Sequence, residues 1–115
     1  MALVLLVEDD ELVRETTAEL IRELGHQVVE ADSAESARSC LQRTGFDVLL
    51  VDVGLPGLQG DVFAAEARAI RSGLRIVFAT GRADFPAVVD GARNPLLLRK
   101  PYDLDALATA LADAP

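Results

Sequence analysis

The stretch FDVLLVDVGLPGLQG, from Phe46 to Gly60, decides the fold of this chain. Its apolar run, Val48 to Val51, is followed by turn-forming residues at 54–57, a pattern typical of a strand buried on both faces of a parallel sheet. The run ends in Asp52, and burying an unpaired charge is costly, so this carboxylate is a poor candidate for core packing. Ligands bind at the carboxyl ends of strands in open parallel sheets, which places Asp52 at the predicted working edge of the domain.

Length, composition and charge restrict the class of protein. The chain has 115 residues, 50% hydrophobic and 26% charged, as expected for one globular domain spanning residues 1–115. The formal net charge of −8 argues against direct binding to nucleic acid or to an anionic membrane surface. The single Cys40 cannot form an internal disulfide, no apolar run approaches the roughly 20 residues of a membrane span, and the segment MALVLLV lacks the basic lead of a signal peptide. We therefore expect a soluble cytoplasmic domain without membrane insertion.

Strand-like and helix-like segments alternate along the chain. Strands are predicted at 2–7, 27–31, 48–51, 74–79 and 96–99, and helices at about 12–24, 33–44, 60–71 and 104–111. The segment 82–94 contains Pro86 and Gly91, so any helix within it is predicted to be short or irregular. Strand–helix units joined by right-handed crossovers predict an α/β fold, a doubly wound five-stranded parallel sheet of the flavodoxin-like type with strand order 2-1-3-4-5.

The spacing of apolar residues predicts which helix faces are buried. The apolar stripe of the first helix recurs every four residues, at Leu12, Thr16, Leu20 and Leu24, and Val13, Thr17 and Ile21 lie beside it. Gly25 follows as the predicted end of that helix, and Asp32 or Ser33 can cap the next one. In the second and third helices, the residues expected to be buried are Ala34, Ala37, Cys40, Leu41, Val62, Phe63, Ala67 and Ile70.

Side chains suited to phosphate and metal chemistry close four of the predicted strands. In the order 2-1-3-4-5 the topology reverses between the first and third strands, which brings Glu8, Asp9 and Asp52 into one crevice. Three carboxylates so close cannot all stay ionised unless a cation neutralises them. Oxygen ligands without His or Cys select Mg²⁺ or Mn²⁺ rather than Zn²⁺. Lys100 and the Thr80 hydroxyl would supply a charge and a hydrogen-bond donor to a phosphoryl group.

These residues occur in an order that resembles the receiver domain of two-component response regulators, and the CheY-like fold is what this resemblance implies. The set consists of Glu8-Asp9, Asp52, Thr80 and Lys100-Pro101, each at a strand end. The resemblance covers essentially the whole chain. It implies that Asp52 accepts a phosphoryl group from a histidine kinase or a histidine phosphotransfer protein.

The resemblance also implies roles for the neighbouring groups. Asp9 would bind Mg²⁺ directly, Glu8 would help through water, and the backbone carbonyl of Gly54 would be a further ligand together with Asp52. Thr80 would donate a hydrogen bond to the phosphoryl oxygen, and Lys100 would pair with it. Such a domain is a phosphoacceptor that assists its own phosphorylation and dephosphorylation, and is not itself an enzyme. Its output would reach a downstream protein partner or an attached module through a changed contact surface.

Two features depart from the pattern of the family and leave alternatives open. The family usually carries an aromatic residue three positions before the lysine, where this chain has Leu97, and Tyr102 lies beyond the lysine. The segment between Thr80 and Lys100 is also short for the family, and its helix is predicted to be weak. A receiver-like interaction module with impaired activation switching is therefore an alternative. A small Mg²⁺-dependent aspartate-nucleophile phosphatase is disfavoured. That class carries a D-x-D pattern, with a second acid two residues after the nucleophile, and this chain has Gly54 at that position. Receivers of hybrid histidine kinases and single-domain response regulators share the remaining features.

Overall fold

A five-stranded parallel sheet forms the centre of the structure, a computed structural model that describes residues 2–52, 60–80, 96–99 and 103–111. The elements, in chain order, are β1 (Leu3–Val7), α1 (Glu11–Glu23), β2 (Gln27–Ala31), α2 (Ala34–Arg43), β3 (Val48–Asp52), α3 (Gly60–Ile70), β4 (Arg75–Thr80), β5 (Leu96–Arg99) and α4 (Leu104–Leu111). The strand order is β2-β1-β3-β4-β5, and every pair of neighbours is parallel. The predicted fold class and strand order are confirmed, whereas the short helix predicted within 82–94 lies outside the described residues.

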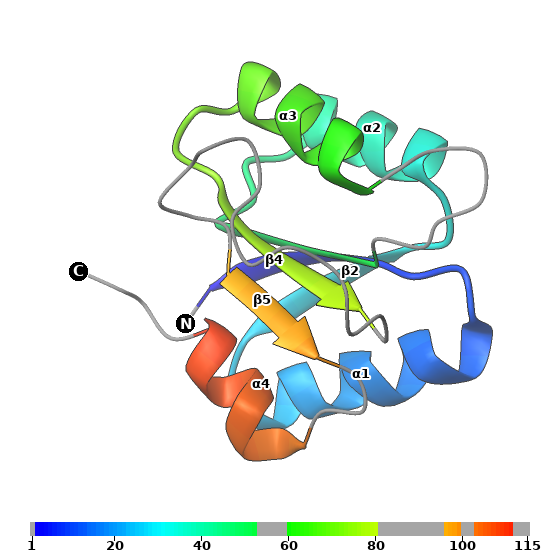
Figure 1. Cartoon of the computed structure of the whole chain (residues 1–115), viewed down its shortest axis with the longest axis vertical. Helices are drawn as coiled ribbons and strands as arrows, with labels where there is room; N and C mark the ends of the chain where they lie inside the picture. Colours follow the sequence, from blue (N-terminus) through cyan, green and yellow to red (C-terminus); the bar gives the residue numbers. More distant parts are fainter. Residues whose placement is uncertain (1, 53–59, 81–95, 100–102, 112–115) are drawn as a thin grey trace.

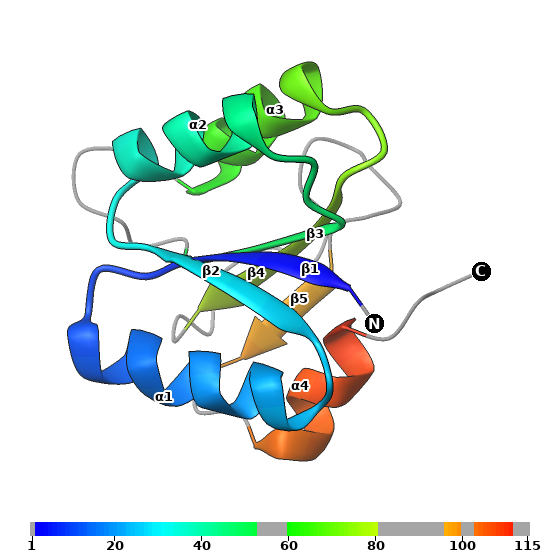
Figure 2. The same ribbon diagram turned by 180° about the vertical axis from the view of Figure 1, so that it is seen from behind.

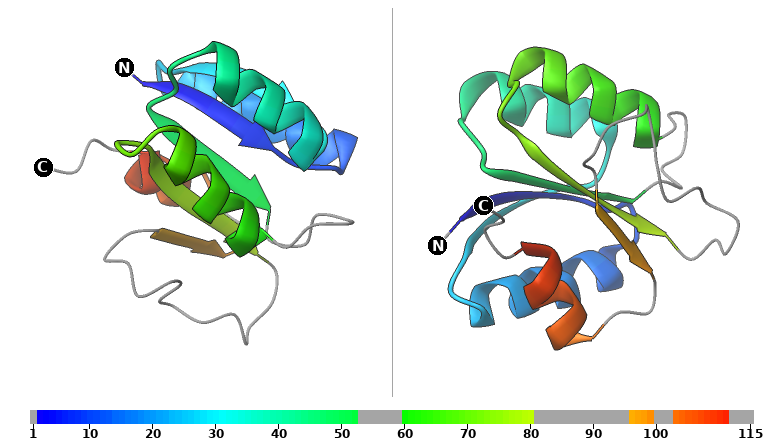
Figure 3. Two further views of the ribbon diagram at one scale, coloured as in Figure 1. Left: turned by 90° about the horizontal axis from the view of Figure 1, so that it is seen from above. Right: turned by 60° about the vertical axis from the view of Figure 1, so that its left-hand side comes forward.

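The sheet is covered on both faces by helices, as a parallel sheet requires. Figure 1 shows α2 and α3 on one face and α1 and α4 on the other, and the same layers are seen from behind in Figure 2. In the left panel of Figure 3, seen from above, α2 and α3 lie over the inner strands, and β5 lies at the edge of the sheet beyond α3. Among the described residues, none of the helices combines the length and the apolar character that crossing a lipid bilayer requires.

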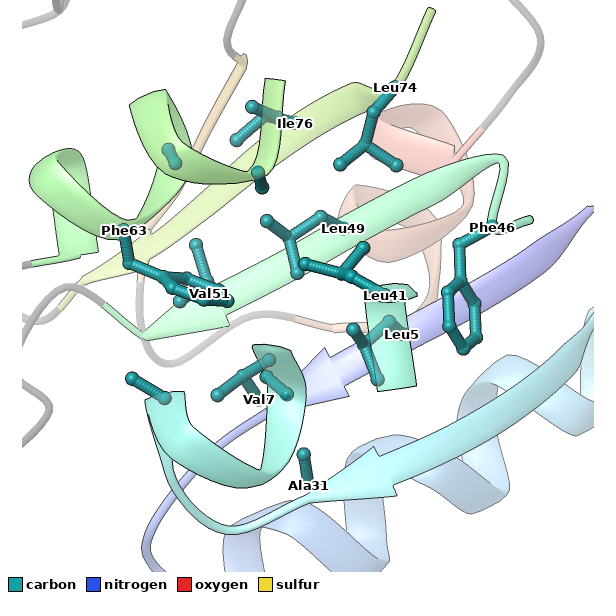
Figure 4. Close-up of a cluster of buried hydrophobic side chains, with 14 of the residues drawn as sticks. Leu5, Val7, Ala31, Leu41, Phe46, Leu49, Val51, Phe63, Leu74 and Ile76 are labelled. Carbon is teal, nitrogen blue, oxygen red and sulfur yellow. The ribbon is translucent and has the colours of Figure 1, made fainter. Parts of the chain in front are cut away.

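Successive side chains along each strand point to opposite faces of the sheet, which divides the core into two halves. Side chains of Leu5, Val7, Leu49 and Val51 pack with α2 and α3, as Figure 4 shows for the labelled residues. The intervening strand residues pack with α1 and α4, and these are Val4, Leu6, Val48 and Leu50. Each fully buried leucine, valine or phenylalanine stabilises the fold by roughly 1.5–3 kcal/mol relative to an exposed one. The central strands β1 and β3 are therefore apolar on both faces, and the one charge between them, Asp52, lies where β3 ends.

Side-chain caps fix where the helices begin. The side chain of Asp10 accepts a hydrogen bond from the Val13 N–H and caps α1, and Ser33 does the same for α2 by accepting from the Ser36 N–H. The sequence allowed Asp32 or Ser33 as the cap of α2, and the structure shows that it is Ser33. Helix α1 ends at Glu23, with Leu24 as its C-cap. Gly25 follows the cap, and its φ of 90° lies in the left-handed region that glycine adopts without strain.

The burial predicted for α1 is only partly correct. Thr17 and Ile21 are buried as expected, together with Ala18, whereas Leu12 is 74% exposed. Positions four residues apart advance about 40° around the helix with each step, because a turn takes about 3.6 residues. A stripe of such positions therefore rotates away from the sheet, and Leu12 at the start of α1 faces solvent while Leu20 packs against the core.

The prediction for α3 also needs correction at its two ends. Phe63 and Ala67 are buried as expected, but Val62 is 48% and Ile70 42% exposed. Val62 is rotated by about 100° from Phe63 on the helix, so the two side chains cannot both face the sheet. Ile70 is the last residue of α3, where solvent reaches the side chain. In α2 the predicted face is confirmed, with Cys40 half-buried at its margin.

The amino-terminal ends of the strands are held by two side chains that play no part in the predicted site. The Leu3 N–H donates to Asp47 Oδ2 at 2.8 Å, and the Ala2 N–H donates to His26 Nδ1 at 2.9 Å. Each contact joins segments far apart in the chain, so this edge of the sheet is fixed by tertiary hydrogen bonds. His26 is half-buried and accepts a backbone hydrogen bond, which gives it a structural role.

An ion pair joins α2 to α3 above the sheet. Arg38 donates through Nε to Glu66 Oε2 at 2.7 Å and through Nη2 to Oε1 at 3.2 Å, a two-pronged contact that suits the guanidinium fork. The guanidinium carbon also lies 5.8 Å from the centroid of the Phe63 ring, within range of a cation–π contact. The hydrogen bond from Arg38, followed by the attraction of its charge, lowers the pKa of Glu66 below its ordinary value.

This pKa shift predicts a pH-dependent contribution to stability. Because the pKa of Glu66 is lower in the folded chain than in the unfolded chain, the contribution is present above the unfolded value and is lost as the pH falls through the folded value. The Glu66→Gln variant should unfold at a lower urea concentration than the parent at neutral pH, and the difference should shrink on acidification. The control is Glu19→Gln, an exposed glutamate of α1 that has no ion pair with the described residues. A difference between the parent and Glu66→Gln that stays constant with pH contradicts the prediction.

Candidate functional site

The register of the sheet brings the ends of the central strands to one edge. Val7 of β1 pairs with Val51 of β3, so the residues that follow them, Glu8 and Asp52, lie at the same level on neighbouring strands. Asp52 in turn pairs with Ala79 of β4. The edge predicted from the sequence is therefore formed by the pairing of β1 with β3.

Three carboxylates meet at this edge. One carboxylate oxygen from each of Glu8, Asp9 and Asp52 lies within 4.8 Å of the other two. Glu8 is only 4% exposed, Asp52 is half-buried and Asp9 is exposed. Like charges at this separation, one of them buried, favour a bound cation that neutralises them. The structure thus brings together the three acids that the sequence singled out.

The donor set fits a hard divalent cation. All three donors are carboxylate oxygens, which Mg²⁺, Mn²⁺ and Ca²⁺ prefer, and no Cys or His belongs to the cluster. Mg²⁺ commonly binds one or two protein carboxylates and keeps several waters. The exposure of Asp9 leaves space on the solvent side for those waters and for the oxygens of a phosphoryl group. The cluster could therefore hold a metal ion.

The turn that carries Glu8 and Asp9 is built by local hydrogen bonds. The Glu8 N–H donates to the Ala31 carbonyl of β2 at 3.0 Å, which extends the β1–β2 ladder by one bond. The Asp10 N–H donates to Glu8 Oε2 at 3.2 Å, and Asp10 Oδ1 accepts from the Val13 N–H at 3.0 Å. Asp10 is engaged in capping α1 and does not belong to the carboxylate cluster.

The remaining predicted site residues are described only in part. Thr80 is the last residue of β4, and its backbone pairs with Arg99 of β5. The Thr80 side chain, Gly54 and Lys100 lie outside the described part of the chain, as does the side chain of Leu97. The roles predicted for these residues stay predictions.

One residue near the site was not singled out in the sequence. Arg14 of α1 donates through Nη1 to the backbone carbonyl of Glu8 at 3.1 Å, and its Nε lies 3.5 Å from Glu30 Oε1. A basic side chain close to a helix amino terminus is unfavourable for the helix dipole, where acids such as Glu11 are favoured. That position was the available hint that Arg14 serves a contact outside its own helix.

Solved structures define the class of protein to which this fold and edge correspond. A receiver domain described as CheY-like, from Methylobacillus flagellatus, superimposes with a TM-score of 0.88 at 26% identity, over 96% of each chain. The receiver domain of the hybrid histidine kinase CckA gives a TM-score of 0.78 at 30% identity, over 93% of each chain. The response regulator TrrA from Thermotoga maritima, solved in complex with Mg²⁺–BeF, gives 0.68 at 26% identity over 72% of each chain. The protein is thus a CheY-like α/β domain.

The chain belongs to the response regulator receiver domain family, whose profile matches residues 4–112. It is 33% identical over 116 residues to the receiver protein CpdR of Brucella abortus, covering 96% of this chain and 94% of CpdR. It is also 33% identical over 113 residues to the response regulator FleR of Pseudomonas aeruginosa, covering 96% of this chain but 24% of FleR. The same domain thus makes up nearly all of one relative and about a quarter of another.

The capping role of Asp10 gives a prediction for stability. Asp10→Ala removes the acceptor of the Val13 N–H and should lower the free energy of unfolding by about 0.5–2 kcal/mol, measured by urea unfolding in metal-free buffer. Asp10→Asn loses the same charge but keeps a capping oxygen, so it should stay close to the parent. Asp32→Ala, beside the cap of α2 but not the cap itself, should also change stability little. Equal losses in Asp10→Ala and Asp10→Asn would show that the cap is not the cause.

Proposed function

We propose that this domain is a phosphoacceptor, in which Asp52 takes a phosphoryl group from a phosphohistidine of a histidine kinase or a histidine phosphotransfer protein. The observation that carries the proposal is the meeting of the Glu8, Asp9 and Asp52 carboxylates within 4.8 Å at the carboxyl end of the sheet, in a chain of the receiver family. Asp52 is half-buried, so a donor can reach it from solvent while the strand holds it in place.

The transfer needs few chemical steps from the protein. A carboxylate oxygen of Asp52 attacks the phosphorus in line, the new O–P bond forms, and the P–N bond of the donor breaks. The electron pair of that bond stays on the ring nitrogen, and with a proton already on the other ring nitrogen the donor is left as a neutral histidine. The product is an acyl phosphate, and its hydrolysis by water restores Asp52 and releases inorganic phosphate. The domain is consumed and regenerated as a substrate, and we class it as a non-enzyme that assists its own turnover.

The acids beside Asp52 suit a metal-assisted transfer. Asp9 is exposed and can bind Mg²⁺ (or Mn²⁺) directly, and the Gly54 carbonyl is proposed as a further ligand. Glu8 is buried and accepts the Asp10 N–H, so it would act through a bound water. A bound Mg²⁺ would neutralise the acids and the charge on the phosphoryl oxygens. The complex of TrrA with Mg²⁺–BeF supports this assignment.

Thr80 and Lys100 complete the proposed site. Lys100 would pair with the phosphoryl oxygens, and Thr80 would donate a hydrogen bond to them. Phosphorylation adds about 1.5 to 2 negative charges at this edge, and the response of Thr80 would alter a nearby protein-contact surface. We propose a cytoplasmic domain that signals to a downstream protein or to an attached module, as the CckA receiver is part of a hybrid histidine kinase.

A second function is a receiver-like interaction module whose phosphorylation does not switch its contacts. Leu97 at the position that is usually aromatic favours it, because a leucine cannot provide the aromatic side chain that couples to Thr80 in the family. The two functions differ in binding. A switching receiver changes its affinity for a partner on phosphorylation, whereas the module binds equally in both states.

Phosphorylation of Asp52 is tested by labelling with acetyl phosphate and Mg²⁺, followed by intact-mass measurement. The parent should gain the mass of one phosphoryl group, and Asp52→Asn should gain none, because the amide cannot form the acyl phosphate. Asp47→Asn is a matched control at the other end of β3, where an amide oxygen can still accept the Leu3 N–H, and it should label like the parent. Labelling of Asp52→Asn to the extent of the parent rules out the proposed acceptor.

Metal binding is a separate prediction. Asp9→Ala should abolish the signal of a calorimetric Mg²⁺ titration, because it removes the proposed direct ligand. Asp10→Asn removes one negative charge from the neighbouring residue, which caps α1, and should retain the signal. If both variants lose the signal equally, the effect comes from net charge and Asp9 is not a ligand.

A further inference from the structure

We infer that Arg14 is a positioning residue for the metal-binding acids, and that its ion pair with Glu30 holds it in that role. The inference rests on the Mg²⁺ site proposed above and adds two residues to it. Neither Arg14 nor Glu30 belongs to the carboxylate cluster.

The contacts of Arg14 join three elements. From α1 its Nη1 donates to the Glu8 carbonyl at the end of β1, at 3.1 Å, and its Nε lies 3.5 Å from Glu30 Oε1 of β2. The side chain of Arg14 is 17% exposed and that of Glu30 is 29% exposed, so both groups are largely withdrawn from water. A hydrogen bond from a cation is roughly twice as strong as one between neutral groups. The guanidinium therefore restrains the chain where β1 turns toward α1.

The positioning role of Arg14 follows from the group that it contacts, the Glu8 carbonyl. The Glu8 carbonyl belongs to the peptide plane between Glu8 and Asp9, the two acids that would bind the metal with Asp52. The amide on the other side of Glu8 is fixed by its bond to the Ala31 carbonyl. Rotation of the Glu8–Asp9 plane would swing Asp9 relative to Asp52, and the bond from Arg14 opposes that rotation. Arg14 thus orients a ligand without touching the metal, as second-layer groups of metal sites do.

Glu30 keeps the fork of Arg14 in place. Glu30 pairs with Leu6 in the sheet, one residue before the Val7–Ala31 pair, so its position is set by the β1–β2 register. It also accepts from Arg22 Nη2 at 3.4 Å, and the Arg22 side chain is 54% exposed. Within the described part of the chain, Arg22 contacts Glu30 and makes no hydrogen bond to Glu8, which makes it a matched control among the arginines of α1.

An electrostatic account makes the opposite prediction. A cation near three carboxylates lowers their repulsion and opposes the binding of a second cation. If charge alone mattered, Arg14→Gln would bind Mg²⁺ more tightly than the parent and Arg14→Lys would match the parent. If Arg14 positions the turn, both variants bind more weakly, because lysine keeps the charge but cannot make both contacts at once.

The experiment measures the dissociation constant of MgCl₂ by calorimetry on the unphosphorylated chain at constant ionic strength. We expect Arg14→Lys and Arg14→Gln to weaken binding about tenfold, the low end of second-layer substitutions, and Glu30→Gln to weaken it in the same direction by less. Arg22→Gln should stay within about twofold of the parent, since it changes the same net charge without reaching Glu8. Urea unfolding identifies the variants that are folded, and Glu30→Gln leaves Arg14 itself unchanged.

A second readout separates positioning from a general loss of structure. In acetyl phosphate labelling, the half-saturating Mg²⁺ concentration should rise about tenfold in Arg14→Lys, whereas the rate at saturating Mg²⁺ should change by less than about twofold. Damage to the fold would instead lower the maximal rate and the urea midpoint without moving the half-saturating concentration.

The outcomes distinguish this inference from the proposed function. Mg²⁺ binding by Arg14→Lys and Arg14→Gln within twofold of the parent, or tighter binding by Arg14→Gln, overturns the role of Arg14 and leaves phosphorylation of Asp52 intact. If acetyl phosphate does not label the parent, but the Arg14 variants still bind Mg²⁺ more weakly than the parent, the phosphoacceptor proposal is overturned and the positioning role of Arg14 is supported. A parent that binds no Mg²⁺ overturns both the metal site and the inference.

Discussion

The parallel pairing of β1 with β3 is the constraint on which the site depends. It sets Val7 opposite Val51, so the first residues beyond that pair, Glu8 and Asp52, are forced to one level at one edge. The pairing is stabilised by apolar side chains on both faces of the strands and cannot shift by one residue without turning those side chains to the wrong half of the core. The repulsion between the acids is thereby imposed by the packing, and a bound cation would relieve it.

The acids are not held by the strands alone. The Glu8–Asp10 turn is tied to β2 through the Ala31 carbonyl, to α1 through the Asp10 cap, and to both through Arg14 and Glu30. Each tie fixes a different part of the turn, namely the amide, the start of the following helix and the carbonyl. A metal that binds to such a turn meets ligands whose directions are already set, which lowers the ordering cost of binding.

Residues of one type serve opposite purposes at the two ends of β3. Asp47 and Asp52 flank the same apolar run, yet Asp47 accepts the Leu3 N–H, whereas Asp52 lies among two further carboxylates. Their chemistry is set by what the register places beside them. The other helical layer shows the same dependence on neighbours, since the low pKa of Glu66 arises from Arg38, 28 residues earlier in the chain.

Much of this protein was determined by its sequence alone. The apolar runs and breakers predicted the strands, and the strand order came from the doubly wound type of fold that alternating strands and helices indicate. That order was enough to group Glu8, Asp9 and Asp52, because the carboxyl ends of parallel strands share an edge. The spacing of apolar residues did not correctly predict which helix face is buried, since Leu12 and Val62 are exposed although their spacing predicted burial. Spacing along one helix is a local property, whereas the face that meets the sheet is chosen by packing against other elements. The contact of Arg14 with the Glu8 carbonyl and with Glu30 was decided only by the tertiary structure, because it requires α1, the end of β1 and β2 to be in place together.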